Sequence, residues 1–228
     1  MPLALSKKHI RPELKVKIDN KDIQQGTEAK YLGVIMDENL SWAPHVQKVE
    51  KKVASSCWAL KAISEYVTRD VMKKIYFGII YAHLFYCISC WGSVPSSRSK
   101  KLFTLQKRAV RTIEKVPVTT SSSALFKNLN FLKLQDIYSL RLATIMYKIN
   151  NGTWMGNTEF KKVSSIHKHF TRSSASDRFY TPKVKTNAAK NSFYYMGPKV
   201  YSEIPLSIRK LPINSFKKEV CKRLMQNY

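Results

Sequence analysis

The chain has 228 residues, of which 40 are lysine or arginine and 15 are aspartate or glutamate, so its formal net charge is +25. A hydrophobic content of 44% is enough to bury a core, and a chain of this length is expected to fold as one or two domains. The charge far exceeds what solubility requires and indicates a polyanionic partner, most often nucleic acid, although ribosomal and anionic-membrane proteins carry similar charge.

Cysteine usage and the lack of a leader suggest the compartment. The four cysteines, at positions 57, 87, 90 and 221, follow no regular spacing, and no secretory signal precedes them. We therefore expect reduced thiols in a nuclear or cytoplasmic protein that is not secreted. The most apolar run, residues 75–91, contains His83 and Ser89 and is at the short limit for a membrane span. We expect it to be a buried helix and expect no membrane partner.

The N-terminal part predicts a small β-hairpin. Residues 14–18 alternate apolar and basic side chains, which is typical of a half-buried strand, and turn-forming residues follow at 19–22. Residues 31–36 form a second β-favouring run that ends at Asp37. We expect the two runs to pair, with the apolar side chains of the first facing inward. Gly33 indicates a bulge or the close approach of another backbone, or else a small residue beneath a helix.

Helical spacing of apolar residues follows from Ser41 onward. A first amphipathic helix begins after Ser41, whose hydroxyl can cap it, and a second, apolar almost all round and therefore central, runs from Arg69 to Trp91 with Thr68 as its cap. The other expected helices lie at 99–116, around 125–129, at 134–149 and at 214–226. Between the last two, residues 161–190 are polar and basic, which favours an exposed segment or a flexible linker.

The helix at 99–116 separates apolar and basic faces more clearly than any other segment. Its basic positions are Lys100, Lys101, Lys107, Arg108, Arg111 and Lys115. Lysine and arginine neutralise phosphates and release their counterions, so we predict that these six residues bind nucleic acid. A merely solvated basic face is the alternative.

The sequence offers no convincing catalytic or metal-binding cluster. The acidic pairs Asp19 with Asp22 and Asp37 with Glu38 are expected to be solvated turn residues. Cys87 and Cys90, with His83 one turn earlier, supply at most three ligands for zinc, so buried reduced cysteines are favoured. His167 and His169 contact phosphate or are merely polar. We expect no catalytic residue, no metal ligand, no cofactor and no small-molecule substrate.

Several motifs resemble the reverse transcriptases of non-LTR retrotransposons, the jockey-like LINE elements. The run Lys30-Tyr31-Leu32-Gly33-Val34, followed by Leu40-Ser41-Trp42 and Pro44-His45-Val46, is similar to the segment after their catalytic centre. The similarity continues through Tyr86, Trp91-Gly92, residues 105–111, Tyr194-x-x-Gly197-Pro198, Ile204-Pro205 and Phe216-Lys217-Lys218. In that family the first of these segments forms the last palm strands, which correspond to the primer grip, and leads into the thumb.

The resemblance implies a mainly α fold in three parts. Residues 1–40 would be a palm-end β-hairpin, residues 41–152 a helical thumb-like domain and residues 153–228 a basic C-terminal extension. The primer-grip-like residues would be Tyr31, Leu32, Gly33 and Val34. The partner would be RNA and DNA, as a primer–template duplex.

The resemblance also bears on activity. The parent family is an RNA-directed DNA polymerase whose aromatic-Ala-Asp-Asp hairpin binds magnesium, and that hairpin belongs upstream of residue 1. This chain is therefore expected to lack the catalytic motif and to be inactive alone. The alternative function is a free-standing basic RNA-binding or structural protein with no polymerase partner.

Overall fold

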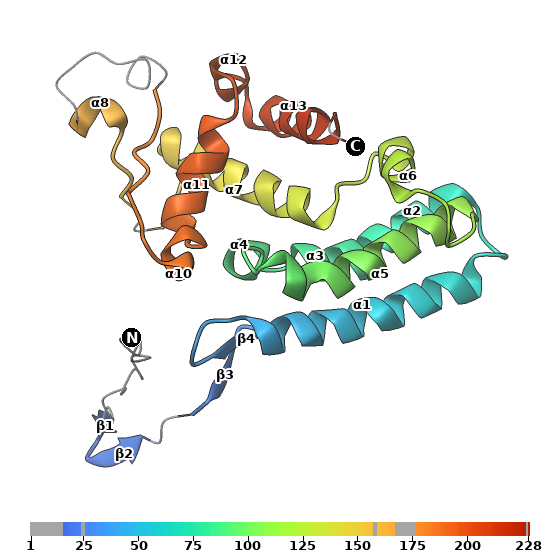
Figure 1. The fold of residues 1–228 in the computed structure, drawn as a ribbon, viewed down its shortest axis with the longest axis horizontal. Coiled ribbons are helices and arrows are strands. Elements are labelled where there is room, and N and C mark those ends of the chain that lie inside the picture. The colour runs from blue at the N-terminus through green and yellow to red at the C-terminus, as the bar shows by residue number, and fades with distance from the viewer. Residues whose placement is uncertain (1–15, 24–25, 157–158, 167–176, 227) are drawn as a thin grey trace, which may run out of the picture.

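The fold consists of two small β-hairpins followed by packed helices (Figure 1). The structure is a computed structural model that describes residues 16–23, 26–156, 159–166, 177–226 and 228. The predicted fold class, mainly α with a small N-terminal β-hairpin, is confirmed, with two hairpins in place of one. His167 and His169 lie outside the described residues. Within the described ranges, no helix is both long enough and apolar enough to cross a membrane.

The first hairpin pairs β1 (Val16–Ile18) with β2 (Lys21–Ile23) in antiparallel register. Asp19 and Asn20 form its turn with φ angles of 49° and 60°, in the left-handed region that these residue types tolerate. The predicted pairing of residues 14–18 with residues 31–36 is therefore wrong, because this turn sends the chain straight back. The predicted inward face is also wrong at Ile18, whose side chain is exposed.

The second hairpin pairs β3 (Glu28–Tyr31) with β4 (Val34–Asp37). The predicted single strand over residues 31–36 is therefore the end of β3, a turn and most of β4. Leu32 and Gly33 form the two-residue turn with φ angles of 45° and 82°. Such turns need positive φ at both central positions, which glycine adopts without steric cost. Gly33 therefore allows the tight turn and does not form a bulge.

Asp37 connects the second hairpin to α1 (Ala43–Ile63). Its carboxylate accepts the backbone N–H of Ser41 at 3.1 Å and of Trp42 at 2.9 Å, so it satisfies donors just before the helix. Asp37 is therefore a structural residue and not merely a solvated one. The predicted amphipathic helix is confirmed, since Val46, Val49, Val53 and Leu60 are all buried.

The predicted continuous helix from Arg69 to Trp91 is interrupted. It is divided into α2 (Arg69–Tyr76), the π-helical turn η1 (Phe77–Tyr81), α3 (Ala82–Phe85) and α4 (Ile88–Trp91). The break before α4 lies at Cys87, which has a φ of 49°, and the indole N–H of Trp91 donates to the carbonyl of Tyr86 there at 2.8 Å. The predicted central position holds for one face, which comprises Met72, Tyr76, Ile80, Leu84, Ile88 and Trp91.

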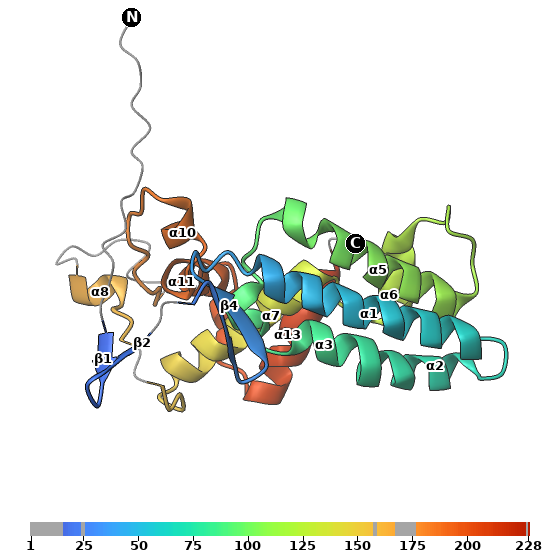
Figure 2. The same cartoon turned by 90° about the horizontal axis from the view of Figure 1, so that it is seen from below.

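The other helices of this unit are α5 (Ser96–Glu114), α6 (Ser122–Leu129) and α7 (Leu134–Asn150). Figure 2 shows α1 running beside α5 on one side and beside α2 and α3 on the other. Buried Gln106 joins these helices, because its amide donates to the Tyr76 hydroxyl at 3.0 Å and to the Leu132 carbonyl at 2.9 Å. Its carbonyl accepts the N–H of Leu134 at 2.9 Å. This network fixes the start of α7 against α5.

Two of the C-terminal helices, α11 (Phe193–Ser202) and α13 (Ile213–Met225), pack on α7. The other helices of this part are α8 (Val163–Ile166), α10 (Asn187–Lys190), which contacts α11, and α12 (Leu206–Arg209), which contacts α13. Met146 and Tyr147 of α7 share a buried cluster with Tyr201 of α11 and Phe216 of α13. Phe179 is only 5% exposed and pairs with Lys162 in a β-bridge, so the predicted exposed linker is anchored there. The division of the chain into three domains stays a prediction.

Candidate nucleic-acid interface

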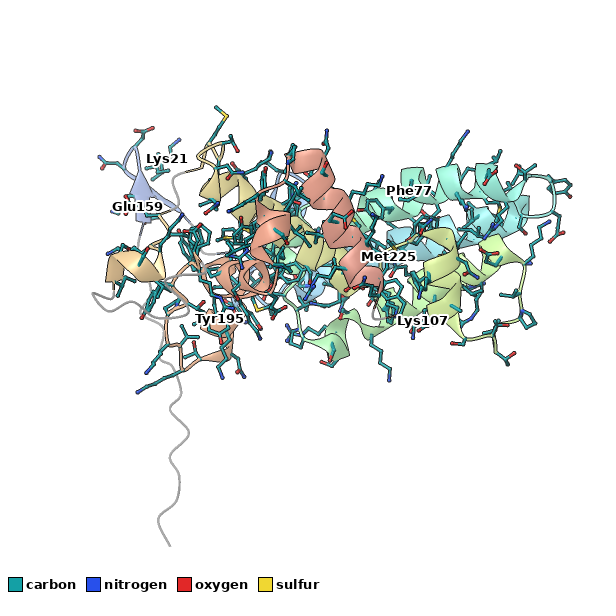
Figure 3. The ribbon with its side chains drawn as sticks, turned by 90° about the horizontal axis from the view of Figure 1, so that it is seen from above. Lys21, Phe77, Lys107, Glu159, Tyr195 and Met225 are labelled. Atoms are coloured by element: carbon teal, nitrogen blue, oxygen red, sulfur yellow. The ribbon has the colours of Figure 1, made fainter. Side chains whose placement is uncertain are left out.

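The six predicted basic residues share one side of α5. At about 100° per residue they fall within an arc of about 120°, with Lys115 just past the helix end in a left-handed conformation. The buried positions point the other way and are Leu102, Gln106, Ala109, Val110 and Ile113. Figure 3 shows the side chains that project from the helices, with Lys107 labelled on α5. The predicted separation of apolar and basic faces is therefore present in the folded chain.

Three of the six basic side chains already have an ion-pair or hydrogen-bond partner. Lys101 forms an ion pair with Glu50 of α1 at 3.5 Å, and Lys115 forms one with Glu65 at 3.6 Å. The Nε of Arg111 donates to the carbonyl of Thr120 at 2.8 Å, which ties the loop after α5 to the helix. Exposed ion pairs contribute little to stability, so Lys115 can exchange its carboxylate for a phosphate at low cost. Glu50 is buried, so the same exchange at Lys101 would leave a buried carboxylate without its cation.

The remaining three have fewer contacts with the protein. The ammonium of Lys107 lies 4.3 Å from the ring centroid of Phe103, in cation–π geometry. No carboxylate of the described residues forms an ion pair with Lys100 or Arg108. These two cations are therefore the most available on the α5 surface.

A groove of about 540 Å³ lies between the C-terminal end of α1 and the second half of α5; we call it the α1–α5 groove. Its basic side chains are Lys61 of α1 with Arg108, Arg111 and Lys115 of the α5 segment, and Glu65 is the one acidic residue in its lining. Sequence analysis missed Lys61 as a site residue. Its helical spacing showed only that it was exposed, and nothing in the sequence indicated that α1 packs along α5.

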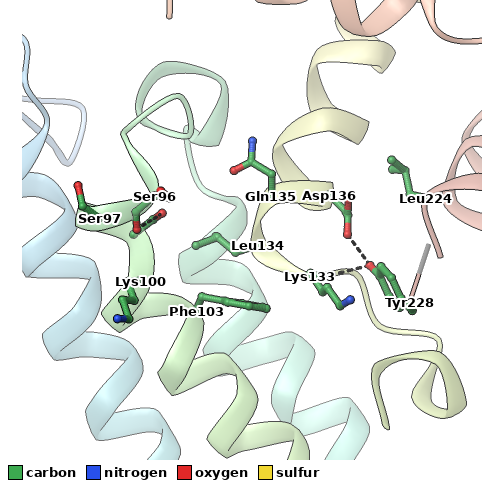
Figure 4. Close-up of a pocket in the computed structure, with 11 residues that line it drawn as sticks. Ser96, Ser97, Lys100, Phe103, Lys133, Leu134, Gln135, Asp136, Leu224 and Tyr228 are labelled. Carbon is green, nitrogen blue, oxygen red and sulfur yellow. Dashed lines mark hydrogen bonds between the residues drawn. The ribbon is translucent and has the colours of Figure 1, made fainter. Parts of the chain in front are cut away.

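Lys100 lies at a different cavity, of about 850 Å³, at the other end of α5 (Figure 4). There Tyr228 accepts the backbone N–H of Lys133 at 2.9 Å and donates to the carboxylate of Asp136 at 2.7 Å. Burial raises the pKa of Asp136, whereas the Tyr228 hydroxyl acts to lower it. The structure thus brings Arg108, Arg111 and Lys115 together in one groove and leaves Lys100 apart from them.

The primer-grip-like residues form the turn of the second hairpin. Tyr31 and Leu32 are 65% and 72% exposed, whereas Val34 is only 7% exposed. The turn is held from below, because the hydroxyl of Tyr86 donates to the Leu32 carbonyl and the ammonium of Lys48 donates to the Gly33 carbonyl at 3.2 Å. These contacts fix the turn against α1 and the end of α3, and the turn presents two apolar side chains to solvent.

Several curated proteins of mobile elements are similar to part of this chain. The probable RNA-directed DNA polymerase from transposon BS of Drosophila melanogaster is 24% identical over 125 residues, which are 53% of this chain and 14% of that protein. The RNA-directed DNA polymerase from mobile element jockey of Drosophila funebris is 31% identical over 94 residues, or 40% of this chain and 10% of that protein. The probable RNA-directed DNA polymerase from transposon X-element of Drosophila melanogaster is 27% identical over 139 residues, or 59% of this chain and 14% of that protein.

The chain is similar to a segment of jockey-like reverse transcriptases. The resemblance predicted from the sequence is thereby confirmed. The chain spans between 10% and 14% of the length of these relatives. No family model and no solved structure matches it.

The acidic side chains and the cysteines are the remaining candidates for metal binding. The N–H groups of Ser41 and Trp42 hold the pKa of Asp37 below its ordinary value, although partial burial acts to raise it. Within the described ranges, no three histidine, cysteine, aspartate or glutamate side chains are grouped as a metal site. The four cysteines are free thiols, and the expectation that Cys87 and Cys90 are buried is wrong, because Cys87 is half-buried and Cys90 is exposed.

Proposed function

We propose that this chain is a C-terminal part of a non-LTR retrotransposon reverse transcriptase and grips the sugar–phosphate backbone of a primer–template duplex. The observation that carries the proposal is the α1–α5 groove, in which basic side chains from two helices line one concave surface. Similarity to RNA-directed DNA polymerases favours this role over a free-standing RNA-binding or structural protein. Such a protein would work in the nucleus or cytoplasm.

The groove suits phosphate rather than base recognition. Arginine has five N–H donors, and Arg111 uses only its Nε for Thr120, which leaves the terminal amino groups for a phosphate oxygen. Lys61 and Arg108 add two cations to the groove. Lysine and arginine side chains neutralise phosphates, and contacts to phosphate do not read base edges. We therefore expect binding with little sequence preference.

Fluorescence anisotropy with an RNA–DNA duplex tests the proposal. The variant with Lys61→Gln and Arg108→Gln removes two groove cations whose side chains make no hydrogen bond within the described structure. A matched control carries Lys210→Gln and Lys217→Gln, two exposed lysines near α12 and α13. We expect at least tenfold weaker binding for the groove variant and a much smaller loss for the control. Equal losses in the two variants would show that net charge alone, and not the groove, holds the duplex.

The second part of the proposal is that the chain has no polymerase activity of its own. Polymerases hold two divalent ions with closely placed carboxylates, and magnesium would belong to the catalytic part of the parent enzyme. Asp37 uses both carboxylate oxygens to accept backbone N–H groups. We expect no primer extension by the purified chain with magnesium present. Extension that survives purification and is abolished by Asp37→Ala would contradict this part.

A further inference from the structure

A second basic cavity lies beneath the turn of the second hairpin, on the side of α1 that faces α2 and α3; we call it the hairpin pocket. Its volume is about 460 Å³, within the range of ligand sites. Lys30 of β3, Lys48 and Lys52 of α1, and His83 of α3 contribute its titratable side chains together with His45 and Tyr86. No aspartate or glutamate lines this pocket.

Two hydrogen bonds build the pocket and orient one of its lysines. Lys48 donates to the Gly33 carbonyl at 3.2 Å, and Tyr86 donates to the Leu32 carbonyl, so the hairpin turn is fastened above α1. An ammonium group has three donors, and this contact uses one of them. Lys48 therefore keeps two N–H donors in a fixed position at the wall of the pocket.

His45 supplies a buried donor without a partner. Its side chain is only 3% exposed, and its Nδ1 accepts the N–H of Ile35 at 3.4 Å. With Nδ1 as the acceptor, the neutral ring carries its proton on Nε2, and that atom has no hydrogen-bond partner within the described structure. A buried polar group without a partner is costly, so it indicates a missing ligand or water.

The charges around the pocket repel one another. Burial and then the charge of Lys48 lower the pKa of His45, and burial and then the charge of Lys52 lower the pKa of His83. Three ammonium groups lie around the pocket without a carboxylate, and a bound small anion would reduce the repulsion between them. Phosphate fits this chemistry, because lysine binds it as a point charge and its several oxygens accept from donors in different directions.

We propose that the hairpin pocket is a phosphate-binding site for one phosphate group of a nucleic acid strand, separate from the α1–α5 groove. The source of the phosphate rests on the proposed function, whereas the site itself does not. A phosphate held here would fix a strand directly beneath the exposed residues Tyr31 and Leu32. The pocket would thus set the position of a strand, and the groove would supply most of the affinity for its backbone.

Small anions test the site without nucleic acid. Isothermal titration of the full chain with pyrophosphate should give one saturable site. The variant with Lys30→Gln and Lys52→Gln, whose side chains make no hydrogen bond in the described ranges, should bind pyrophosphate at least tenfold more weakly. Lys48→Gln should weaken it similarly, and circular dichroism reports whether the fold is kept. The groove variant with Lys61→Gln and Arg108→Gln should bind pyrophosphate as the wild type does.

The outcomes separate this inference from the proposed function. Loss of duplex binding in the groove variant with intact pyrophosphate binding supports both sites as independent. No saturable pyrophosphate binding, or equal binding by the wild type and the Lys30 and Lys52 variant, would overturn the hairpin pocket whatever the duplex does. Oligonucleotides with a 5′-phosphate and with a 5′-hydroxyl distinguish a terminal from an internal phosphate. If the wild type binds the 5′-phosphorylated form more tightly and the Lys30 and Lys52 variant does not, the ligand is a terminal phosphate. Equal binding of both forms, weakened by the variant, would identify an internal one.

Discussion

Lys61 on α1 and Arg108 on α5 line the same groove, although they belong to different helices far apart in the sequence. The packing of α1 along α5 brings them together, and it also pairs Lys101 with Glu50 across the two helices. The basic surface is therefore a property of the folded bundle and not of one helix alone. Disrupting the contact between α1 and α5 should remove the groove even if every basic residue is kept.

The turn of the second hairpin should be sensitive to a single added methyl group. Gly33 has a φ of 82°, and a side chain in that region is strained, so Gly33→Ala should lower the free energy of unfolding by about 1–2 kcal/mol. Gly78 is the matched control, because an added Cβ meets nothing within 4 Å and the residue lies in a helical segment. Chemical denaturation should show no loss for Gly78→Ala. Equal effects of the two changes would contradict the turn argument.

The start of α1 should depend on pH through Asp37. The pKa of its carboxyl is lowered in the folded chain, so its contribution to stability is present above the unfolded pKa and is lost as the pH falls through the folded value. Asp37→Ala should therefore be less stable than the wild type at about pH 7, and this difference in stability should shrink as the pH falls from the unfolded pKa towards about pH 2. Urea unfolding at the two pH values measures this. If the difference in stability between Asp37→Ala and the wild type is the same at both pH values, the stabilisation by Asp37 comes from packing and not from its charge.

The C-terminal helices should be required for the stability of α7. Phe216 of α13 is fully buried and lies 4.5 Å from Tyr147 between ring centroids, so Phe216→Ala should cost about 3–5 kcal/mol. Phe77, which is 46% exposed, is the control, and Phe77→Ala should cost clearly less. Thermal unfolding of both variants tests whether residues 153–228 form part of one core. A negligible effect of Phe216→Ala would favour a detachable extension.

Trp58 is an exposed aromatic residue beside the groove. Its side chain is 72% exposed and lies one turn before Lys61 on α1. Stacking on an unpaired base is worth about 1–3 kcal/mol, so Trp58→Ala should weaken binding to a duplex with a single-stranded overhang by that amount and leave a blunt duplex almost unaffected. Quenching of tryptophan fluorescence by the overhang should disappear in the variant. Unchanged quenching would place the stacking elsewhere.

Apolar spacing was sufficient to predict most helices, because a buried face must repeat every three to four residues. Val46, Val49 and Val53 follow that rule, and all three are buried. The turn at Leu32 and Gly33 could not be read in the same way. Two-residue hairpin turns are usually marked by asparagine or aspartate before glycine, and Leu32 takes a positive φ without that signal.

The candidate site was only partly accessible from the sequence. One helix carries Arg108, Arg111 and Lys115, so helical spacing alone predicted that they share a side. Lys61 and the hairpin pocket depend on how α1 packs against α5 and α3, which is set by long-range contacts that local patterns do not encode. The π-helical turn at 77–81 likewise leaves no mark in the apolar spacing.

The salt dependence of duplex binding tests the central claim most directly. Each phosphate contact contributes about one unit to the slope of log affinity against log salt concentration, so the variant with Lys61→Gln and Arg108→Gln should lose about two units of slope. The loss should be the same for duplexes of unrelated sequence, because backbone contacts carry no base information. Fluorescence anisotropy over a salt series gives the slopes. A variant that folds normally and keeps the wild-type slope would remove the α1–α5 groove from the binding surface.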